Sequence, residues 1–256
     1  EKGVARFILK MLEKISCKNS TSIECVCNSN LRLGVQEKIF PVNKATVVWN
    51  GSTGGVDLKK FDCNKRERWR TEIRKELDIS EKDIWFAGRI TKDKGINELI
   101  QAFLELKNES KLLLIGPPEG INTLDTKLWN WAKENESVLI HDAVSDIERY
   151  FAAMDVLILP SYREGFGNVI IEAAAMGTTA ICTNIQGPSD IIVDSTTGLL
   201  CNVKDANSLL ECMKTVLKNQ YYKELGSNAE NYVKNNYDNT ILCEKILERK
   251  RVLLES

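Results

Sequence analysis

The sequence predicts an α/β protein, built as a Rossmann-like parallel sheet with helices on both faces. Short apolar segments alternate with amphipathic ones through most of the 256 residues. This alternation is typical of parallel strands that are buried on both faces. The loops that follow the apolar segments are rich in glycine and charged residues. Because the carboxyl ends of parallel strands share one edge of a sheet, we expect these loops to form a ligand site there.

Composition argues against several classes of partner and cofactor. Apolar residues make up 43% of the chain and charged residues 28%, with a net charge of −1, so we expect no nucleic-acid partner. The single histidine argues against a His-rich metal site, and the eight cysteines lack zinc-ligand spacing, so we expect no metal. The cysteines suit a reducing compartment, and no run could span a bilayer. We therefore expect a cytoplasmic location.

The first part of the chain predicts two helices and two strands. Apolar positions at helical spacing predict a helix over residues 4–16. Residues 21–27 are predicted as a strand, and Asn28-Ser-Asn30 as the start of a short helix that ends near Gln36. A strand over residues 45–49 then leads into a glycine-rich loop at residues 50–55. Such a loop lets backbone approach a ligand closely.

A regular alternation of elements follows. The predicted helices cover residues 65–77, 96–106, 124–133, 145–153, 168–177 and 206–217. The predicted strands cover residues 84–88, 111–115, 137–140, 155–159, 179–182 and 198–201. The segment Ser145-Asp-Ile-Glu148 has the pattern of a capping box, with its serine expected to cap the helix that follows. Two further helical segments fill the remainder of the chain.

The stretch from Leu159 to Gly177 carries the strongest indication of a ligand site. It runs from a buried strand through a glycine turn into an apolar helix that begins near Asn168, which directs free N–H groups and the positive end of a helix dipole at the ligand edge. Glu164 precedes the turn and Glu172 lies on the helix. This spacing favours two acceptors for hydroxyl pairs over a general acid/base pair. A sugar nucleotide fits, since its diphosphate needs donors and its hydroxyls need acceptors.

Three other loops offer weaker candidates. Arg89 and Lys94 follow a buried strand and could neutralise a diphosphate, although a solvated loop would carry the same residues. His141 beside Asp142 suits either a general base or a structural histidine, of which the structural role is the commoner. Gly187-Pro-Ser-Asp190 opens a helix at the same edge and is a further candidate anion contact.

Several motifs together resemble one enzyme family. The segment Glu164-Gly-Phe-Gly-Asn-Val-Ile-Ile-Glu172 is similar to the Glu-x7-Glu signature of the family 4 retaining glycosyltransferases, which have the GT-B fold. Further matching features follow in family order: Asn50-Gly51, Gly88-Arg89 with Lys94-Gly95, Ala152 to Ser161, and Gly198-Leu-Leu200. The loop at residues 50–57 most resembles that of capsular and exopolysaccharide transferases of bacteria.

The resemblance implies roles for individual residues. Arg89 and Lys94 would contact the donor diphosphate and stabilise the leaving group, and Glu164 would lie near the donor sugar; these three are the implied catalytic residues. Glu172 would bind the nucleotide ribose. The remaining implied donor-binding residues are Gly51, Gly116, Val144, Gly165, Phe166, Gly167, Asn168 and Val169. The family needs no metal cofactor.

The chain also departs from the family pattern. Family members have two Rossmann-like domains, and this sequence predicts one. The resemblance therefore implies that residues 1–43 are a remnant of the acceptor-side N-terminal domain, that residues 44–237 bind the nucleotide-sugar, and that residues 238–256 form a helix crossing back to the missing domain. Asp190 stands where the family commonly has glutamate, which leaves its role open.

We therefore expect the donor-binding half of a nucleotide-sugar-dependent retaining glycosyltransferase of bacterial surface polysaccharide synthesis. The expected donor is a UDP-sugar, and the expected acceptor is a glycan or lipid-linked glycan held by the missing domain. The full-length protein could be peripheral to the membrane, and we expect any such contact only through that missing domain. We expect the chain alone to be inactive. Two alternatives stay open: a nucleotide-sugar 2-epimerase, and a noncatalytic nucleotide-sugar-binding module.

Overall fold

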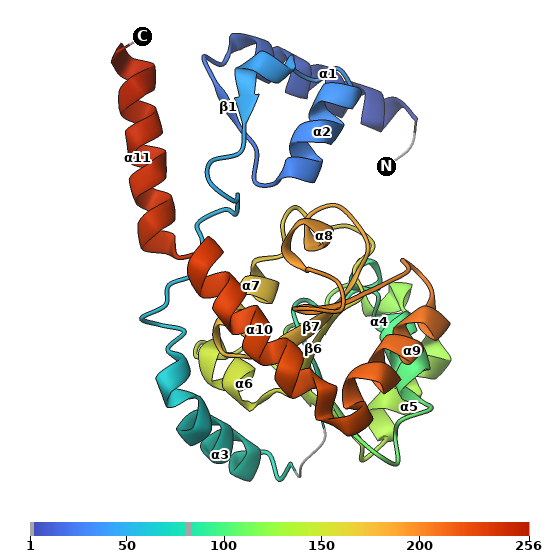
Figure 1. Cartoon of the computed structure of the whole chain (residues 1–256). Coiled ribbons are helices and arrows are strands. Elements are labelled where there is room, and N and C mark those ends of the chain that lie inside the picture. The colour runs from blue at the N-terminus through green and yellow to red at the C-terminus, as the bar shows by residue number, and fades with distance from the viewer. Residues whose placement is uncertain (1–2, 80–82, 256) are drawn as a thin grey trace.

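The computed structural model describes residues 3–79 and 83–255, which form a small N-terminal unit and a larger α/β unit (Figure 1). In the small unit, strands β1 and β2 pair in parallel beside two helices. Its elements are α1 (Val4–Asn19), β1 (Ile23–Glu24), α2 (Asn28–Gln36) and β2 (Ala45–Thr46). The helices agree with the predicted ones, whereas both strands are shorter than predicted. The chain leaves β2 early, and Trp49 already has a left-handed φ of 53°.

The larger unit contains a six-stranded sheet in the order β5-β4-β3-β6-β7-β8, and every pair in it is parallel. The strands are β3 (Asp83–Ala87), β4 (Lys111–Ile115), β5 (Val138–His141), β6 (Val156–Leu159), β7 (Thr179–Thr183) and β8 (Gly198–Cys201). Strands β6 and β7 are buried along their whole length, as expected for a sheet covered on both faces. The predicted fold class is confirmed. The strand order reverses between β3 and β6.

Two groups of helices cover the sheet (Figure 1). Helix α4 packs against α5 and α9, and a second group packs α3 against α6, α6 against α7, and α7 against α10. Their bounds are α3 (Arg66–Glu76), α4 (Ile96–Phe103), α5 (Thr126–Glu134), α6 (Ile147–Ala153), α7 (Asn168–Ala175), α9 (Ala206–Leu217) and α10 (Tyr221–Asn236), with the short α8 (Pro188–Ile191) after β7. Because β3 and β6 send their following helices, α4 and α7, to different groups, a gap opens between the loops at that point.

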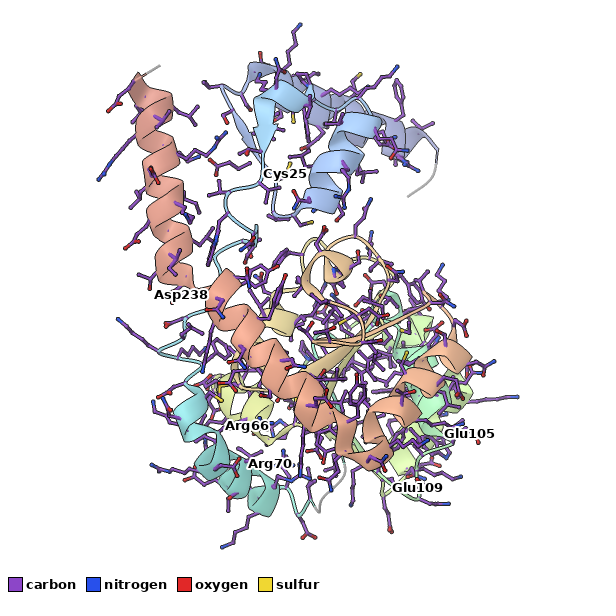
Figure 2. All side chains as sticks on the ribbon, in the orientation of Figure 1. Cys25, Arg66, Arg70, Glu105, Glu109 and Asp238 are labelled. Carbon is purple, nitrogen blue, oxygen red and sulfur yellow. The ribbon has the colours of Figure 1, made fainter. Side chains whose placement is uncertain are left out.

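The last helix, α11 (Asn239–Glu255), returns to the small unit (Figure 1). Its residues Arg249 and Lys250 contact the Glu24 carboxylate at 3.4 and 2.7 Å. At its start, near Asp238 (Figure 2), the backbone bonds to the linker through Val56, whose N–H donates to Tyr237 and whose carbonyl accepts from Asn239. No helix within residues 3–79 and 83–255 is long and apolar enough to cross a membrane.

The capping box predicted at Ser145 is wrong. Helix α6 begins at Ile147 with Asp146 in the N-cap position, and no side chain caps it. The Asp146 carboxylate instead accepts from the guanidinium of Arg149 at 2.9 Å. A tertiary contact explains that preference, because Arg149 also reaches Glu72 on α3 at 3.1 Å.

Two arginines of α3 secure the other end of α6. Arg70 and Arg74 each donate to the Ala153 carbonyl at 2.8 Å, which satisfies the last turn of the helix and suits its negative dipole end. Both also contact the carboxylate of Asp155, a residue that is only 2% exposed. Asp155 thus compensates two cations at the entry to β6.

We expect Asp155→Ala to lower the free energy of unfolding by about 3 kcal/mol, because it leaves two partly buried guanidinium groups without their carboxylate. Urea denaturation measures this. Asp142→Ala is the matched control, since Asp142 is an exposed aspartate beside another strand of the same sheet. Equal, small losses in both variants would contradict the role given to Asp155.

Candidate functional site

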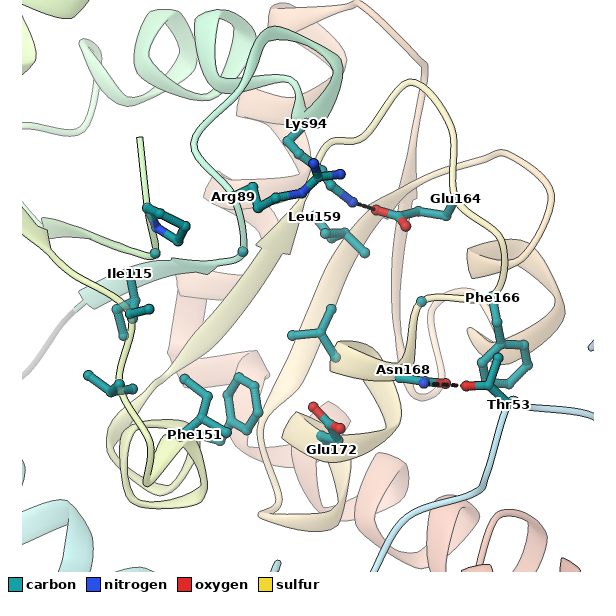
Figure 3. Close-up of a pocket in the computed structure, with 18 residues that line it drawn as sticks. Thr53, Arg89, Lys94, Ile115, Phe151, Leu159, Glu164, Phe166, Asn168 and Glu172 are labelled. Atoms are coloured by element: carbon teal, nitrogen blue, oxygen red, sulfur yellow. Dashed lines mark hydrogen bonds and ion pairs between the residues drawn. The ribbon is translucent and has the colours of Figure 1, made fainter. Parts of the chain in front are cut away.

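A cavity of about 490 Å³ opens at the carboxyl ends of β3, β4 and β6 (Figure 3). It lies where the strand order reverses, which is the position where open parallel sheets bind ligands. Most of the predicted site residues line it: Arg89, Lys94, Gly116, Val144, Glu164, Phe166, Gly167, Asn168, Val169 and Glu172. These residues come from the loops after β3, β4, β5 and β6 and from helix α7. The segments are far apart in sequence, so the sheet brings them together as predicted.

An ion pair joins the two central loops. The Lys94 ammonium contacts the Glu164 carboxylate at 2.6 Å, and the two side chains are only 17% and 13% exposed. The Ser161 hydroxyl donates to the same carboxylate oxygen at 2.7 Å. A side chain at Gly95 would place its Cβ 2.1 Å from the Pro160 carbonyl oxygen, so only glycine allows the loops to approach so closely.

Arg89 adds a second cation to the same wall. Its guanidinium contacts Glu119 at 3.2 Å, and both side chains are about half exposed, so this pair is weakly held. Figure 3 shows the Arg89 and Lys94 side chains extending toward Glu164, to which the Lys94 ammonium is joined. An anion that enters would therefore meet one fixed cation and one that can reorient.

Helix α7 supplies the facing wall. Gly167 precedes it with a left-handed φ of 99°, and no side chain caps its first turn, which leaves N–H donors and the positive helix end directed at the cavity. Asn168 contacts the hydroxyl groups of Thr53 and Ser52, which holds the linker loop against the helix start (Figure 3). The cavity therefore has donors on both sides.

Glu172 lies one turn along α7, where its neighbours are apolar. Burial raises the pKa of the Glu172 carboxyl above its ordinary value, an effect that the Lys60 ammonium partly opposes. A carboxylate so placed costs stability unless a ligand donates hydrogen bonds to it. Its position in the lining of the cavity makes it available to hydroxyl groups.

Two predicted donor-binding residues lie outside the lining. Gly51 is buried, and a Cβ there would lie 2.2 Å from the Val26 carbonyl oxygen, so it packs against the small unit instead. Gly165 is exposed, and its carbonyl accepts from the Asn30 amide of the small unit at 2.8 Å. Gly51 thus packs against the small unit and Gly165 is bonded to it, whereas Thr53 is the residue of the linker loop that reaches the cavity.

Of the three weaker candidates, His141 and Gly187 also lie outside the cavity lining. The His141 ring lies 3.0 Å from the Asp142 carbonyl oxygen and 5.7 Å from the ring of Tyr150, contacts that suit the structural role. The N–H of Gly187 donates to the Ser29 hydroxyl at 3.2 Å. The backbone donor of Gly187 is therefore already used within the protein.

The sequence did not indicate an apolar wall of the cavity, which Figure 3 shows around Ile115 and Phe151. Its members are Ile115, Pro117, Ala143, Ile147 and Phe151, and Leu159 adds an apolar side chain beside Lys94 and Glu164. Ile115 and Leu159 end buried strands, and this position alone could have indicated them. In the part of the chain that the structure describes, no three His, Cys, Asp or Glu side chains gather as a metal site.

The chain is similar in sequence to a known protein family and to several of its members. The family model described as glycosyl transferases group 1 matches residues 69–237. The chain is 32% identical over 96% of its length to the capsular polysaccharide biosynthesis glycosyltransferase CapM of Staphylococcus aureus, and spans 65% of that protein. It is 28% identical over 96% of its length to an N-acetylgalactosaminyltransferase of Campylobacter jejuni that acts on N,N'-diacetylbacillosaminyl-diphospho-undecaprenol, and spans 64% of it. The chain thus spans less than two thirds of these relatives.

Solved structures share the fold. Anabaena HepE, solved in complex with UDP and glucose, superposes with a TM-score of 0.83 over 95% of this chain and 66% of that one, at 17% identity. The C-terminal domain of the group 1 protein LpcC from Francisella tularensis superposes with a TM-score of 0.61, at 25% identity, over 72% of this chain and 99% of that domain.

Glu172 provides a test of the balance between ligand binding and stability. Since folding raises its pKa, the ionised carboxylate destabilises the fold. This cost is present in full above the raised pKa and is lost as pH falls from there to the ordinary glutamate value of about 4.3. We expect Glu172→Gln to raise the melting temperature at neutral pH, with a gain that shrinks as the pH is lowered toward that ordinary value. The exposed Glu136→Gln is the control. A gain independent of pH would contradict this account.

Proposed function

The chain belongs to the group 1 glycosyl transferases, and on this premise we propose that its cavity binds the UDP-sugar donor of a retaining glycosyltransferase. The observation that carries the proposal is the Lys94–Glu164 pair, which stands opposite the uncapped start of α7. That arrangement supplies cations and N–H donors for a diphosphate, with a carboxylate beside them for a sugar hydroxyl.

The rest of a UDP-sugar fits the remaining parts of the cavity. The ribose hydroxyls would donate to Glu172, which otherwise carries a costly charge. The base would lie against Gly116, Pro117 and Val144 on the apolar side. Because Arg89 and Lys94 can neutralise the diphosphate, we propose that the site uses no metal cofactor. The complexes of HepE with UDP and with UDP-glucose support this choice of nucleotide.

The proposed chemistry depends on the departing diphosphate. As the bond between the sugar and the phosphate oxygen breaks, negative charge develops on that oxygen. The acceptor hydroxyl bonds to the sugar and passes its proton to the departing diphosphate. Lys94, Arg89 and the N–H groups at the start of α7 would stabilise that charge. Glu164 would hold the sugar in place as it transfers.

We propose that the whole protein acts in bacterial surface polysaccharide synthesis, on a glycan or lipid-linked acceptor. Its relationships to CapM and to the Campylobacter undecaprenol-linked transferase support this assignment. The named transferase activities of these relatives also favour transfer over the two alternatives, a 2-epimerase and a noncatalytic module. The proposed location is cytoplasmic, peripheral to the membrane in the whole protein.

The acceptor would bind a second domain, of which we propose that residues 1–43 are a part, with residues 44–237 as the donor domain and residues 238–256 crossing back. The separate β1–β2 sheet supports this division. So does α1, whose Val4 and Phe7 are 74% and 68% exposed, an apolar face that further chain of the same domain would cover.

Lys94→Ala is expected to weaken UDP binding by roughly 10- to 150-fold, because a charge-assisted contact is worth about 1.5–3 kcal/mol. Isothermal titration of the 256-residue chain measures it. Lys92→Ala is the matched control, since Lys92 is exposed in the same loop and does not line the cavity. Absence of UDP binding by the well-folded parent chain at millimolar concentration would refute the nucleotide assignment.

The isolated chain is expected to bind UDP-sugar without turning it over, because the acceptor side of the cleft is needed for transfer. Incubation with UDP-sugars, followed by chromatography of products, measures this. A new UDP-sugar epimer would favour the epimerase, and transfer by the chain alone would show that the acceptor site lies within these residues.

A further inference from the structure

The first turn of α2 lies against two loops of the larger unit. The Ser29 N–H donates to the Asp190 carboxylate at 3.1 Å, and the Ser29 hydroxyl donates to the same oxygen. The Ser29 hydroxyl oxygen in turn accepts from the N–H of Gly187. Ser29 is only 8% exposed, so these bonds are shielded from water and contribute more than surface contacts would.

The same turn holds the loop that carries Glu164. Asn30 donates its side-chain amide to the carbonyl of Gly165 at 2.8 Å, and the Cys27 thiol lies 3.8 Å from that oxygen. Gly165 lies between Glu164 and Phe166, both of which line the cavity. A Cβ at Gly187 would lie 2.8 Å from the Phe166 carbonyl oxygen, so the two loops also pack directly on each other.

Asp190 caps the start of α2, which has no capping side chain of its own. No side chain of α2 itself caps its start, where Cys27 is the N-cap residue. The Asp190 carboxylate accepts a helix N–H and places negative charge at the positive helix end. Arg32, one turn further on, lies 3.6 Å from its other oxygen. Asp190 is absent from the lining of the cavity, so its acceptor capacity serves the small unit.

We propose that Ser29, Asn30, Asp190 and the Gly165 carbonyl form a junction, the α2 junction, that fixes the Glu164–Gly167 loop and thereby sets the affinity of the cavity for a sugar nucleotide. The statement about affinity rests on the proposed function. Asp190 and Asn30 are positioning residues, since they act on the donor site through Gly165 and Phe166. Rotating the small unit away from the larger one would break these bonds and release the loop.

Trypsin cleavage after Arg163 tests the junction without any ligand. The Arg163 side chain is 77% exposed, but cleavage requires the neighbouring residues, Gly165 included, to extend into the protease. Asn30→Asp turns the donor into an acceptor that faces the Gly165 carbonyl. Cleavage follows the population of the open loop, so we expect it to accelerate about fivefold or more, the effect of losing one hydrogen bond.

Asn28→Asp is the matched control, because it makes the same chemical change two residues earlier on α2, where Asn28 is exposed. We expect its cleavage rate to equal that of the parent chain. Asn30→Ala, which removes the donor without adding charge, is expected to accelerate cleavage as well. Unchanged cleavage in Asn30→Asp, or acceleration confined to that variant, would overturn the junction.

UDP titration tests the consequence for the cavity. We expect Asn30→Asp to weaken UDP binding, by no more than the roughly fivefold change in the loop population. Asn28→Asp adds the same negative charge near the site, and we expect it to leave UDP binding unchanged. Faster cleavage with unchanged UDP affinity would overturn the positioning role. A parent chain that binds no UDP would instead refute the proposed function, together with the affinity claim, and the cleavage rates would still decide the junction.

Discussion

The reversal of strand order between β3 and β6 is the constraint on which the site depends. It places the loop after β3 beside the loop after β6, although about 70 residues separate Lys94 from Glu164. The helices that follow, α4 and α7, join different packed groups, which leaves room for a cavity where their starts diverge. Gly95 completes the arrangement, because any Cβ there would strike the Pro160 carbonyl.

Charge in the cavity is balanced differently at its two carboxylates. Glu164 has Lys94 and Ser161 as partners before any ligand arrives, so an entering diphosphate competes with Glu164 for the ammonium. Within residues 3–79 and 83–255, Glu172 has no hydrogen-bond or ion-pair partner, and burial raises its pKa. The Glu164 carboxylate therefore holds the Lys94 ammonium in position at little free-energy cost. The buried Glu172 carboxylate destabilises the fold, and hydrogen bonds from the hydroxyl groups of a ligand would offset that destabilisation. This difference separates the two glutamates, which the spacing alone left similar.

The sequence predicted those features that follow from local pattern and from the rule that ligands bind at the carboxyl edge. The parallel strands, the start of α7 at Asn168 and the gathering of Arg89, Lys94, Glu164 and Glu172 all follow from it. It could not predict contacts that depend on tertiary packing. Ser145 fits a capping box, but the contacts of Arg149 with Asp146 and Glu72 prevail. In the same way, the glycine signature does not reveal that the Gly165 carbonyl faces the small unit.

These tertiary contacts change how the signature from Glu164 to Glu172 should be understood. One end of its glycine turn carries the carboxylate in the cavity, and the next carbonyl is bonded to Asn30 in a different unit. Only the few backbone dihedrals between Glu164 and the Gly165 carbonyl can absorb a relative movement of the two. A displacement of α2 beyond what they absorb would therefore change the position of Glu164 or break the Asn30 bond. The donor loop and the orientation of the small unit are coupled mechanically, and Asp190 strengthens that coupling by capping the helix through which it acts.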